Sequence, residues 1–226
     1  MINRVKRKKY GYIFFLGYFM FLFFQIFFVY SEIKYIKYID TLKELFELTI
    51  YILFIIKIIK SKYTIKQIFI ILFIGSMFSI SAYFSRNTLL IKHMIVILAA
   101  KDIKFREIVK FDLIIKTIFI ILVIVMSLLG FLNNYALLRK GSDIYRLSMG
   151  FQHPNTLAAL AMSICYEWIY LRYEKLRSLD YLVVISIMLL TSNISDSRTS
   201  MYSLVILLII TLYTFSDNLK YLNMFL

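Results

Sequence analysis

Residues 112–131 read DLIIKTIFIILVIVMSLLGF, a 20-residue run in which Asp112 and Lys116 are the only charged residues. About 20 mainly apolar residues are needed for an α-helix to cross a bilayer, so this run predicts a membrane span. Asp112 and Lys116 lie four residues apart near its start, one helical turn from each other. We expect them to pair, and the aliphatic stem of Lys116 to extend toward the membrane surface.

Similar apolar runs recur along the whole chain. Hydrophobic residues make up 61% of the 226 residues, and the mean hydropathy is +0.78. A water-soluble domain of this length cannot bury so much apolar surface, whereas a bilayer accepts it. We therefore predict an all-α polytopic membrane protein, with residues 1–226 forming a single transmembrane domain. Its spans are expected near residues 12–30, 42–59, 65–84, 87–100, 112–131, 155–171, 180–195 and 200–215.

The charge pattern predicts the orientation. The net charge of +14 comes from 27 Lys and Arg residues against 13 Asp and Glu residues. The basic residues lie between apolar runs, where they set topology and meet anionic lipid headgroups, so we do not expect a nucleic-acid partner. With eight crossings and both termini cytosolic, inner loops hold more than twice as many basic residues as outer loops. If residues 87–100 do not cross, the two sides become nearly equal, so the positive-inside rule favours eight.

Several kinds of catalytic and metal site are missing from the sequence. There is no glycine-rich phosphate loop and no zinc-binding His-Glu-x-x-His helix. His93 and His153 are the only histidines, and Cys165 is the only cysteine. A disulfide within the chain is therefore impossible, and we expect neither a metal nor a cofactor. His93 is expected to form a hydrogen bond to a neighbouring helix.

The first candidate site is the stretch RLSMGFQHPN, residues 146–155, on the predicted outer face. It contains the only proline, Pro154, which is favoured in the first turn of a helix. Helix N-termini attract anions, so Arg146 and His153 beside one would suit a phosphate group, with an imidazole that accepts a proton. The alternative is that His153 or Asn155 caps the helix and Arg146 contacts lipid phosphates.

The second candidate site is the short polar segment SDSRT, residues 195–199, between two apolar runs. Arg198 would supply a second guanidinium on the outer face, suited to a diphosphate because arginine donates in a fork to phosphate oxygens. Two alternatives remain open. The segment could be a tight turn with helix-capping Ser and Thr residues, or Asp196 could pair with Arg198 and neutralise it.

Together these two segments resemble a known family. Residues 150–155, followed by a helix with alanines 158, 159 and 161, are similar to the Gly-Phe-x-His-Pro-Asn segment of bacterial capsule and exopolysaccharide polymerases. Those enzymes belong to the O-antigen ligase/polymerase superfamily. Ser197-Arg198-Thr199 resembles the Ser-Arg-Thr element of that superfamily, in the same order along the chain.

The resemblance implies metal-independent glycosyl transfer at the outer leaflet of the bacterial cytoplasmic membrane. The donor and acceptor would be oligosaccharide repeats linked to undecaprenyl diphosphate. By position, Arg146 and Arg198 would bind the substrate diphosphate, Asn155 would also bind the substrate, and His153 would deprotonate the attacking sugar hydroxyl. The expected protein partners are the flippase and the chain-length regulator of a polysaccharide assembly system.

One departure from the family and two other functions bear on this interpretation. Family members continue well past the Ser-Arg-Thr element, so the resemblance implies that a chain ending at Leu226 is a truncated form. A transporter is the alternative, with Lys92, His93 and Lys116 as its candidate residues within spans. A non-catalytic membrane scaffold subunit is another. Functional polar residues at the outer boundary favour the polymerase, and those at mid-membrane favour the transporter.

Overall fold

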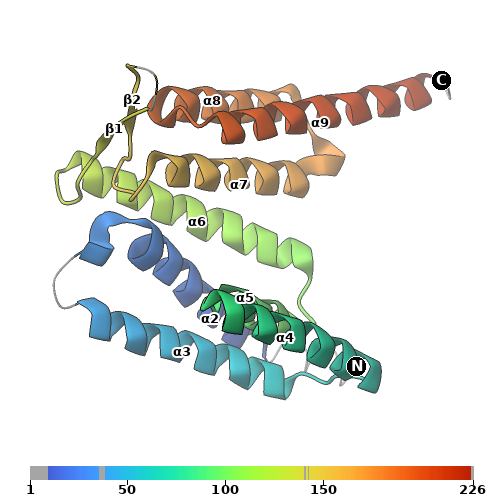
Figure 1. The fold of residues 1–226 in the computed structure, drawn as a ribbon. Coiled ribbons are helices and arrows are strands. Elements are labelled where there is room, and N and C mark those ends of the chain that lie inside the picture. The colour runs from blue at the N-terminus through green and yellow to red at the C-terminus, as the bar shows by residue number, and fades with distance from the viewer. Residues whose placement is uncertain (1–9, 36–38, 140, 142, 225–226) are drawn as a thin grey trace. The chain divides into compact units, whose positions relative to one another are not determined.

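The computed structural model describes residues 10–35, 39–139, 141 and 143–224 of the chain, which are predominantly helical (Figure 1). The basic N-terminal tail, residues 1–9, and Lys140 lie outside the described residues. The all-α prediction is confirmed, with one short two-stranded β-hairpin in addition.

A helix occurs at each position where a span was predicted. In chain order the elements are α2 (Gly11–Phe23), which continues with π-helical pitch over Phe24–Tyr30 and a 3-10 turn over Glu32–Tyr35, α3 (Ile39–Lys60), α4 (Ile65–Ser85), α5 (Leu89–Ala99), α6 (Phe105–Leu128), β1 (Ala136–Leu138), β2 (Tyr145–Leu147), α7 (Pro154–Arg172), a 3-10 turn over Tyr173–Lys175, α8 (Ser178–Ser195) and α9 (Arg198–Met224).

Four helical stretches among the described residues are long and apolar enough to cross a membrane: Gly11–Tyr30, Ile65–Ser85, Phe105–Leu128 and Ser178–Ser195. They give the chain the character of a helical membrane protein. The helix at the span expected near residues 87–100, α5, has only 11 residues. At 1.5 Å per residue it is about 16 Å long, against a hydrocarbon core of about 30 Å. The count of eight crossings and the side on which each terminus lies stay predictions.

Local chemistry accounts for several helix ends. Helix α4 begins with a capping box, in which the Thr64 side chain accepts from the Gln67 N–H and the Gln67 side chain accepts from the Thr64 N–H. Helix α7 begins at Pro154, as the sequence predicted. Helix α8 ends where Asp196 takes up the left-handed conformation, with φ of +43°.

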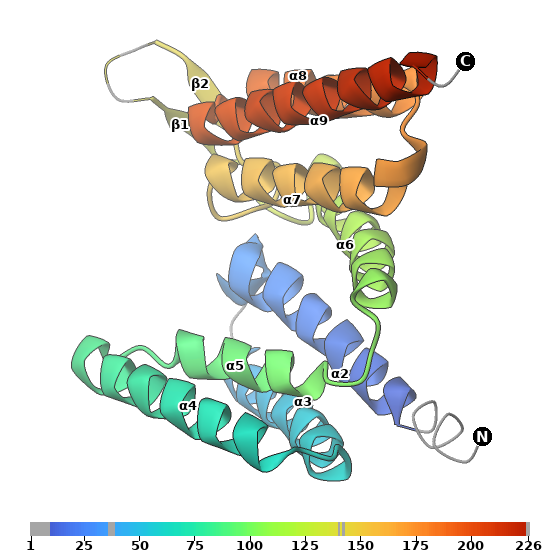
Figure 2. The same cartoon turned by 90° about the vertical axis from the view of Figure 1, so that its right-hand side faces the viewer.

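The chain divides into two compact units, each described by itself. The first takes in the described residues up to Gln25 together with residues 39–108. Helix α2 packs on α3, and α5 packs on both α3 and α4 (Figure 2). Buried rings of Phe14 and Phe54 lie 6.0 Å apart between their centroids. Gly17 permits this packing, because a Cβ there would lie 3.1 Å from the Phe54 ring.

The second unit comprises residues 26–35 and the described residues from 109 onward. Helices α7, α8 and α9 pack on one another around an apolar core formed by Cys165, Ile169, Leu176, Val184, Leu204 and Leu208. Strands β1 and β2 pair antiparallel, with Leu137 opposite Arg146. Figures 1 and 2 show this hairpin at the end of the helices where α7 begins and α8 turns into α9. Both predicted sites therefore belong to one end of this unit.

Candidate functional site

A tight turn delivers the chain from β2 to the start of α7. The Phe151 N–H donates to the Ser148 carbonyl at 3.0 Å, and both central residues, Met149 and Gly150, have positive φ, of +49° and +84°. Glycine reaches this region without a steric penalty. The backbone also passes close to α6 here, since a Cβ on Gly150 would lie 2.9 Å from Ser127 Cβ and 3.0 Å from the Val123 carbonyl.

The same segment is bound to the end of the first helix. The Glu32 N–H donates to the Gly150 carbonyl and the Gln152 N–H to the Tyr30 carbonyl, each at 3.0 Å. The Gln152 side-chain amide adds a bond to the Ser31 carbonyl at 3.2 Å. This pairing joins segments about 120 residues apart in sequence. It was not predicted, because two short irregular segments carry no pairing signal.

His153 is the N-cap residue of α7. Its Nδ1 accepts a hydrogen bond from the Asn155 N–H at 3.1 Å, and Pro154 behind it is buried. His153 therefore caps the helix, which is the alternative that the sequence left open for this residue. An accepting Nδ1 means that the neutral ring carries its proton on Nε2. In this tautomer the remaining ring nitrogen donates a hydrogen bond, which suits a phosphate oxygen.

Arg146 lies in β2, and its side chain reaches the N-terminus of α7. Its guanidinium donates to the Asn155 side-chain carbonyl across 3.4 Å. Its Nε is buried and has no hydrogen-bond partner in the described part of the chain. Arg146, His153 and Asn155 are thus brought together at the N-terminus of α7, where backbone N–H groups and the helix dipole attract anions.

Arg198 is the first residue of α9 and is exposed. Within the described ranges its side chain has no hydrogen-bond or ion-pair partner. The alternative that Asp196 neutralises it is wrong, since Asp196 forms an ion pair with Arg139, whose guanidinium also donates to the Asp196 carbonyl at 3.2 Å. No pattern in the sequence connects Arg139 with Asp196. This pair links the hairpin to the α8–α9 turn and leaves Arg198 available for an anion.

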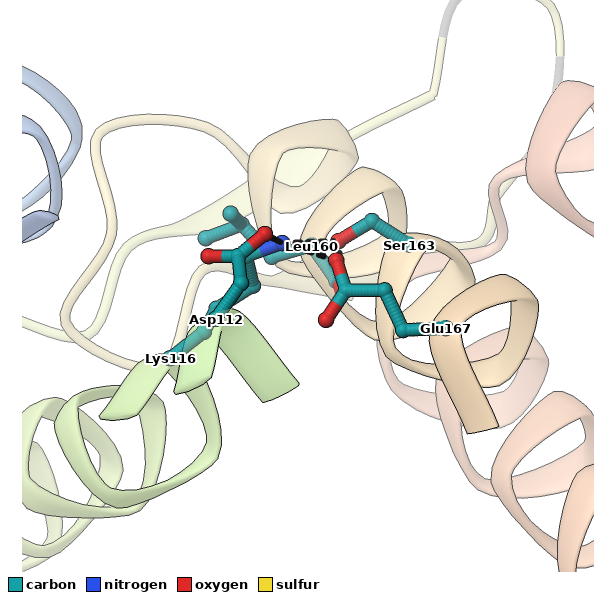
Figure 3. Close-up of polar contacts among 5 residues, drawn as sticks. All are labelled: Asp112, Lys116, Leu160, Ser163 and Glu167. Atoms are coloured by element: carbon teal, nitrogen blue, oxygen red, sulfur yellow. Dashed lines mark hydrogen bonds and ion pairs between the residues drawn. The ribbon is translucent and has the colours of Figure 1, made fainter. Parts of the chain in front are cut away.

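A second polar cluster, which we call the Lys116 cluster, lies between α6 and α7 (Figure 3). It consists of Asp112, Lys116, Ser163 and Glu167. The Lys116 Nζ lies 2.9 Å from Asp112 Oδ2 and 3.3 Å from Ser163 Oγ, and forms an ion pair with Glu167. The predicted Asp112–Lys116 pair is confirmed. Lys116 is held in the protein rather than extending to the surface, and Glu167 was not foreseen.

The other polar residues proposed within spans have local partners in the first unit. Lys92 forms an ion pair with Glu47. The His93 Nδ1 lies 2.8 Å from the Leu89 carbonyl of its own helix, and the ring meets Phe21 edge-on. The expected hydrogen bond from His93 to a neighbouring helix is therefore replaced by one within α5.

The fold and the two clusters define a helical membrane protein with a polar, arginine-containing end in its second unit. Comparison with protein-family models, with curated proteins and with solved structures finds no match.

Proposed function

We propose that this chain is a polysaccharide-polymerase-type glycosyltransferase of the bacterial cytoplasmic membrane. It would join oligosaccharide repeats carried on undecaprenyl diphosphate at the outer leaflet. The observation that carries the proposal is the grouping of Arg146, His153 and Asn155 at the N-terminus of α7. The exposed Arg198, at the same end of the second unit, adds to it.

The chemistry requires a site for a diphosphate leaving group. A hydroxyl of the acceptor sugar attacks the anomeric carbon of the donor, a new C–O bond forms, and the bond to the carrier diphosphate breaks with its electron pair. The developing charge on that diphosphate is stabilised by arginines and helix N–H groups. His153 would donate from Nε2 to a phosphate oxygen, because its Nδ1 already accepts from the Asn155 N–H; it would therefore not take the hydroxyl proton, as the resemblance implied, and that proton would pass to the departing diphosphate. This step needs no metal ion.

The proposal requires the polar end of the second unit to face outward. With eight crossings and both termini cytosolic, the start of α9 lies outside and the start of α8 inside. The flippase and the chain-length regulator of a polysaccharide assembly system are the proposed protein partners. Both would meet the chain in the membrane.

Cysteine labelling tests this orientation. Thr199 and Ser178 are exposed residues at opposite ends of the α8–α9 helical hairpin. In intact cells, Thr199→Cys should react with a membrane-impermeant maleimide and Ser178→Cys should react only after permeabilisation. The native Cys165 is buried and should give a low background. Labelling of position 178 alone in intact cells would reverse the orientation.

Substitutions at the site test the activity. His153→Ala and Arg198→Ala should each abolish polymer extension, measured as the length distribution of polysaccharide in cells that depend on this chain. His153→Asn is the sharper variant, because asparagine caps helices well but lacks an imidazole. Loss of polymer in His153→Asn assigns a chemical role to the ring, whereas normal polymer assigns capping alone.

Matched controls come from the first unit. His93→Ala and Arg86→Ala remove the other histidine and another exposed arginine, and both should leave polymer length unchanged. The proposal fails if Arg198→Ala and His153→Ala make polymer of normal length while present at wild-type amounts.

A transporter is the second candidate, and the Lys116 cluster favours it. Ionisable residues buried inside spans often mark ion or solute paths. A polymerase depends on Arg198, whereas a transporter depends on Lys116. The triple variant Asp112→Asn/Lys116→Met/Glu167→Gln removes the buried charges together, and its comparison with Arg198→Ala separates the two functions.

A further inference from the structure

The Lys116 cluster carries an unbalanced charge when all its groups are ionised. One ammonium, that of Lys116, faces two carboxylates, those of Asp112 and Glu167. The three side chains are only 11–15% exposed. A net negative charge in such surroundings is unfavourable, because the cost of removing an ion from water is recovered only when its charge is compensated.

The second observation is how the two carboxyl groups meet. Figure 3 shows them beside the same Lys116 ammonium. Asp112 Oδ2 lies 2.9 Å from the Lys116 Nζ and Glu167 forms an ion pair with the same ammonium, so two groups that only accept hydrogen bonds when ionised share one donor. One oxygen on each, Asp112 Oδ1 and Glu167 Oε2, is buried without any partner in the described part of the chain. A single additional proton would supply a donor and neutralise the cluster.

We propose that the Lys116 cluster is a proton-binding site, holding one proton between Asp112 and Glu167 in addition to the ammonium of Lys116. The proton converts one carboxylate into a carboxylic acid, whose O–H donates to the other carboxylate. When the proton leaves, the cluster gains one negative charge and the contact between α6 and α7 weakens. This inference does not depend on the proposed polymerase activity.

The groups around the Lys116 cluster favour a proton over a metal cation as its ligand. The charged groups bound to Lys116 in the described part of the chain are the carboxylates of Asp112 and Glu167. Ser163 contributes a neutral hydroxyl that donates to the Leu160 carbonyl of its own helix. From α8, the buried Asp180 is bound instead to Trp168 and Arg172. A metal cation would compete with an ammonium already placed between the carboxylates, whereas a proton does not.

Infrared spectroscopy of the full chain in phosphatidylcholine nanodiscs tests the site. Exposed carboxylates are ionised at pH 7, so a carboxylic acid C=O band at that pH reports a buried protonated group. We expect a band equivalent to one acid per chain, which disappears reversibly in alkaline buffer and shifts in D₂O. Asp112→Asn and Glu167→Gln should each abolish it, since the remaining carboxylate then balances Lys116.

Two other buried carboxyl groups provide controls, because Asp180→Asn and Glu32→Gln should leave the band intact. Carboxyl-¹³C labelling of aspartate or glutamate in the otherwise unsubstituted chain needs no variant, and one of the two labels should shift the band. Absence of an acid band at pH 7 in the folded wild-type chain would overturn the proposal. So would a band that persists in both Asp112→Asn and Glu167→Gln.

Discussion

Gly150→Ala should lower the free energy of unfolding by about 2–5 kcal/mol. A non-glycine residue in the left-handed region costs about 1–2 kcal/mol, and φ at Gly150 is +84°. Overpacking adds about 1–3 kcal/mol, because the new Cβ would lie 3.0 Å from the Val123 backbone carbonyl, which cannot rotate away. The measurement is denaturant unfolding in detergent, followed by the fluorescence of Trp168, the only tryptophan.

Gly130→Ala separates these two contributions. Gly130 has nearly the same φ, +80°, but a Cβ there meets nothing within 4 Å. This variant should lose only the conformational part, about 1–2 kcal/mol. Equal losses in the free energy of unfolding at positions 130 and 150 would show that the close approach of the Gly150 turn to α6 does not contribute to the effect of Gly150→Ala.

Lys116→Met should destabilise the chain by about 3–5 kcal/mol, the usual result of removing one partner from a buried ion pair. Methionine keeps the length of the side chain but leaves Asp112 and Glu167 facing each other without a cation. The loss should grow with rising pH, as the cluster gains negative charge that no ammonium compensates. Unfolding curves at two pH values, read from Trp168 fluorescence, give both quantities.

A lysine paired with an exposed carboxylate provides the control. Lys43 pairs with Asp40, whose side chain is 90% exposed, and exposed ion pairs contribute about 0–1 kcal/mol. Lys43→Met should therefore change stability little. The triple variant Asp112→Asn/Lys116→Met/Glu167→Gln should recover much of the loss, because no buried charge remains in the Lys116 cluster. A loss in Lys116→Met no larger than that in Lys43→Met would contradict the described environment of Lys116.

The sequence was most informative where a local rule decides the structure. The apolar runs predicted where the helices lie, because the thickness of the membrane sets the number of apolar residues that a spanning helix needs. Pro154 placed the start of α7, because proline suits only the first turn of a helix. The four-residue spacing of Asp112 and Lys116 predicted their pair, because helical geometry fixes neighbours at that distance.

The contacts that were missed join residues far apart in sequence. Glu167 lies 51 residues from Lys116 and Asp196 lies 57 residues from Arg139, so no periodicity connects them. Asp196 was considered as a partner of Arg198 because the two are close in sequence. The left-handed backbone at Asp196, a feature of the folded turn, accompanies a different pairing.

The backbone pairing between the first helix and the Gly150 turn has a consequence for biosynthesis. Ser31 must leave the ribosome about 120 residues before Phe151, its bridge partner. At about 5–20 residues per second, translation leaves the end of the first helix without that partner for on the order of ten seconds. During this interval the Tyr30 carbonyl and the Glu32 N–H lack the partners that they have in the folded chain, and water or a chaperone must satisfy them. The two segments can pair only after Phe151 has emerged. Assembly of the polar end is therefore a late event in the biosynthesis of this protein.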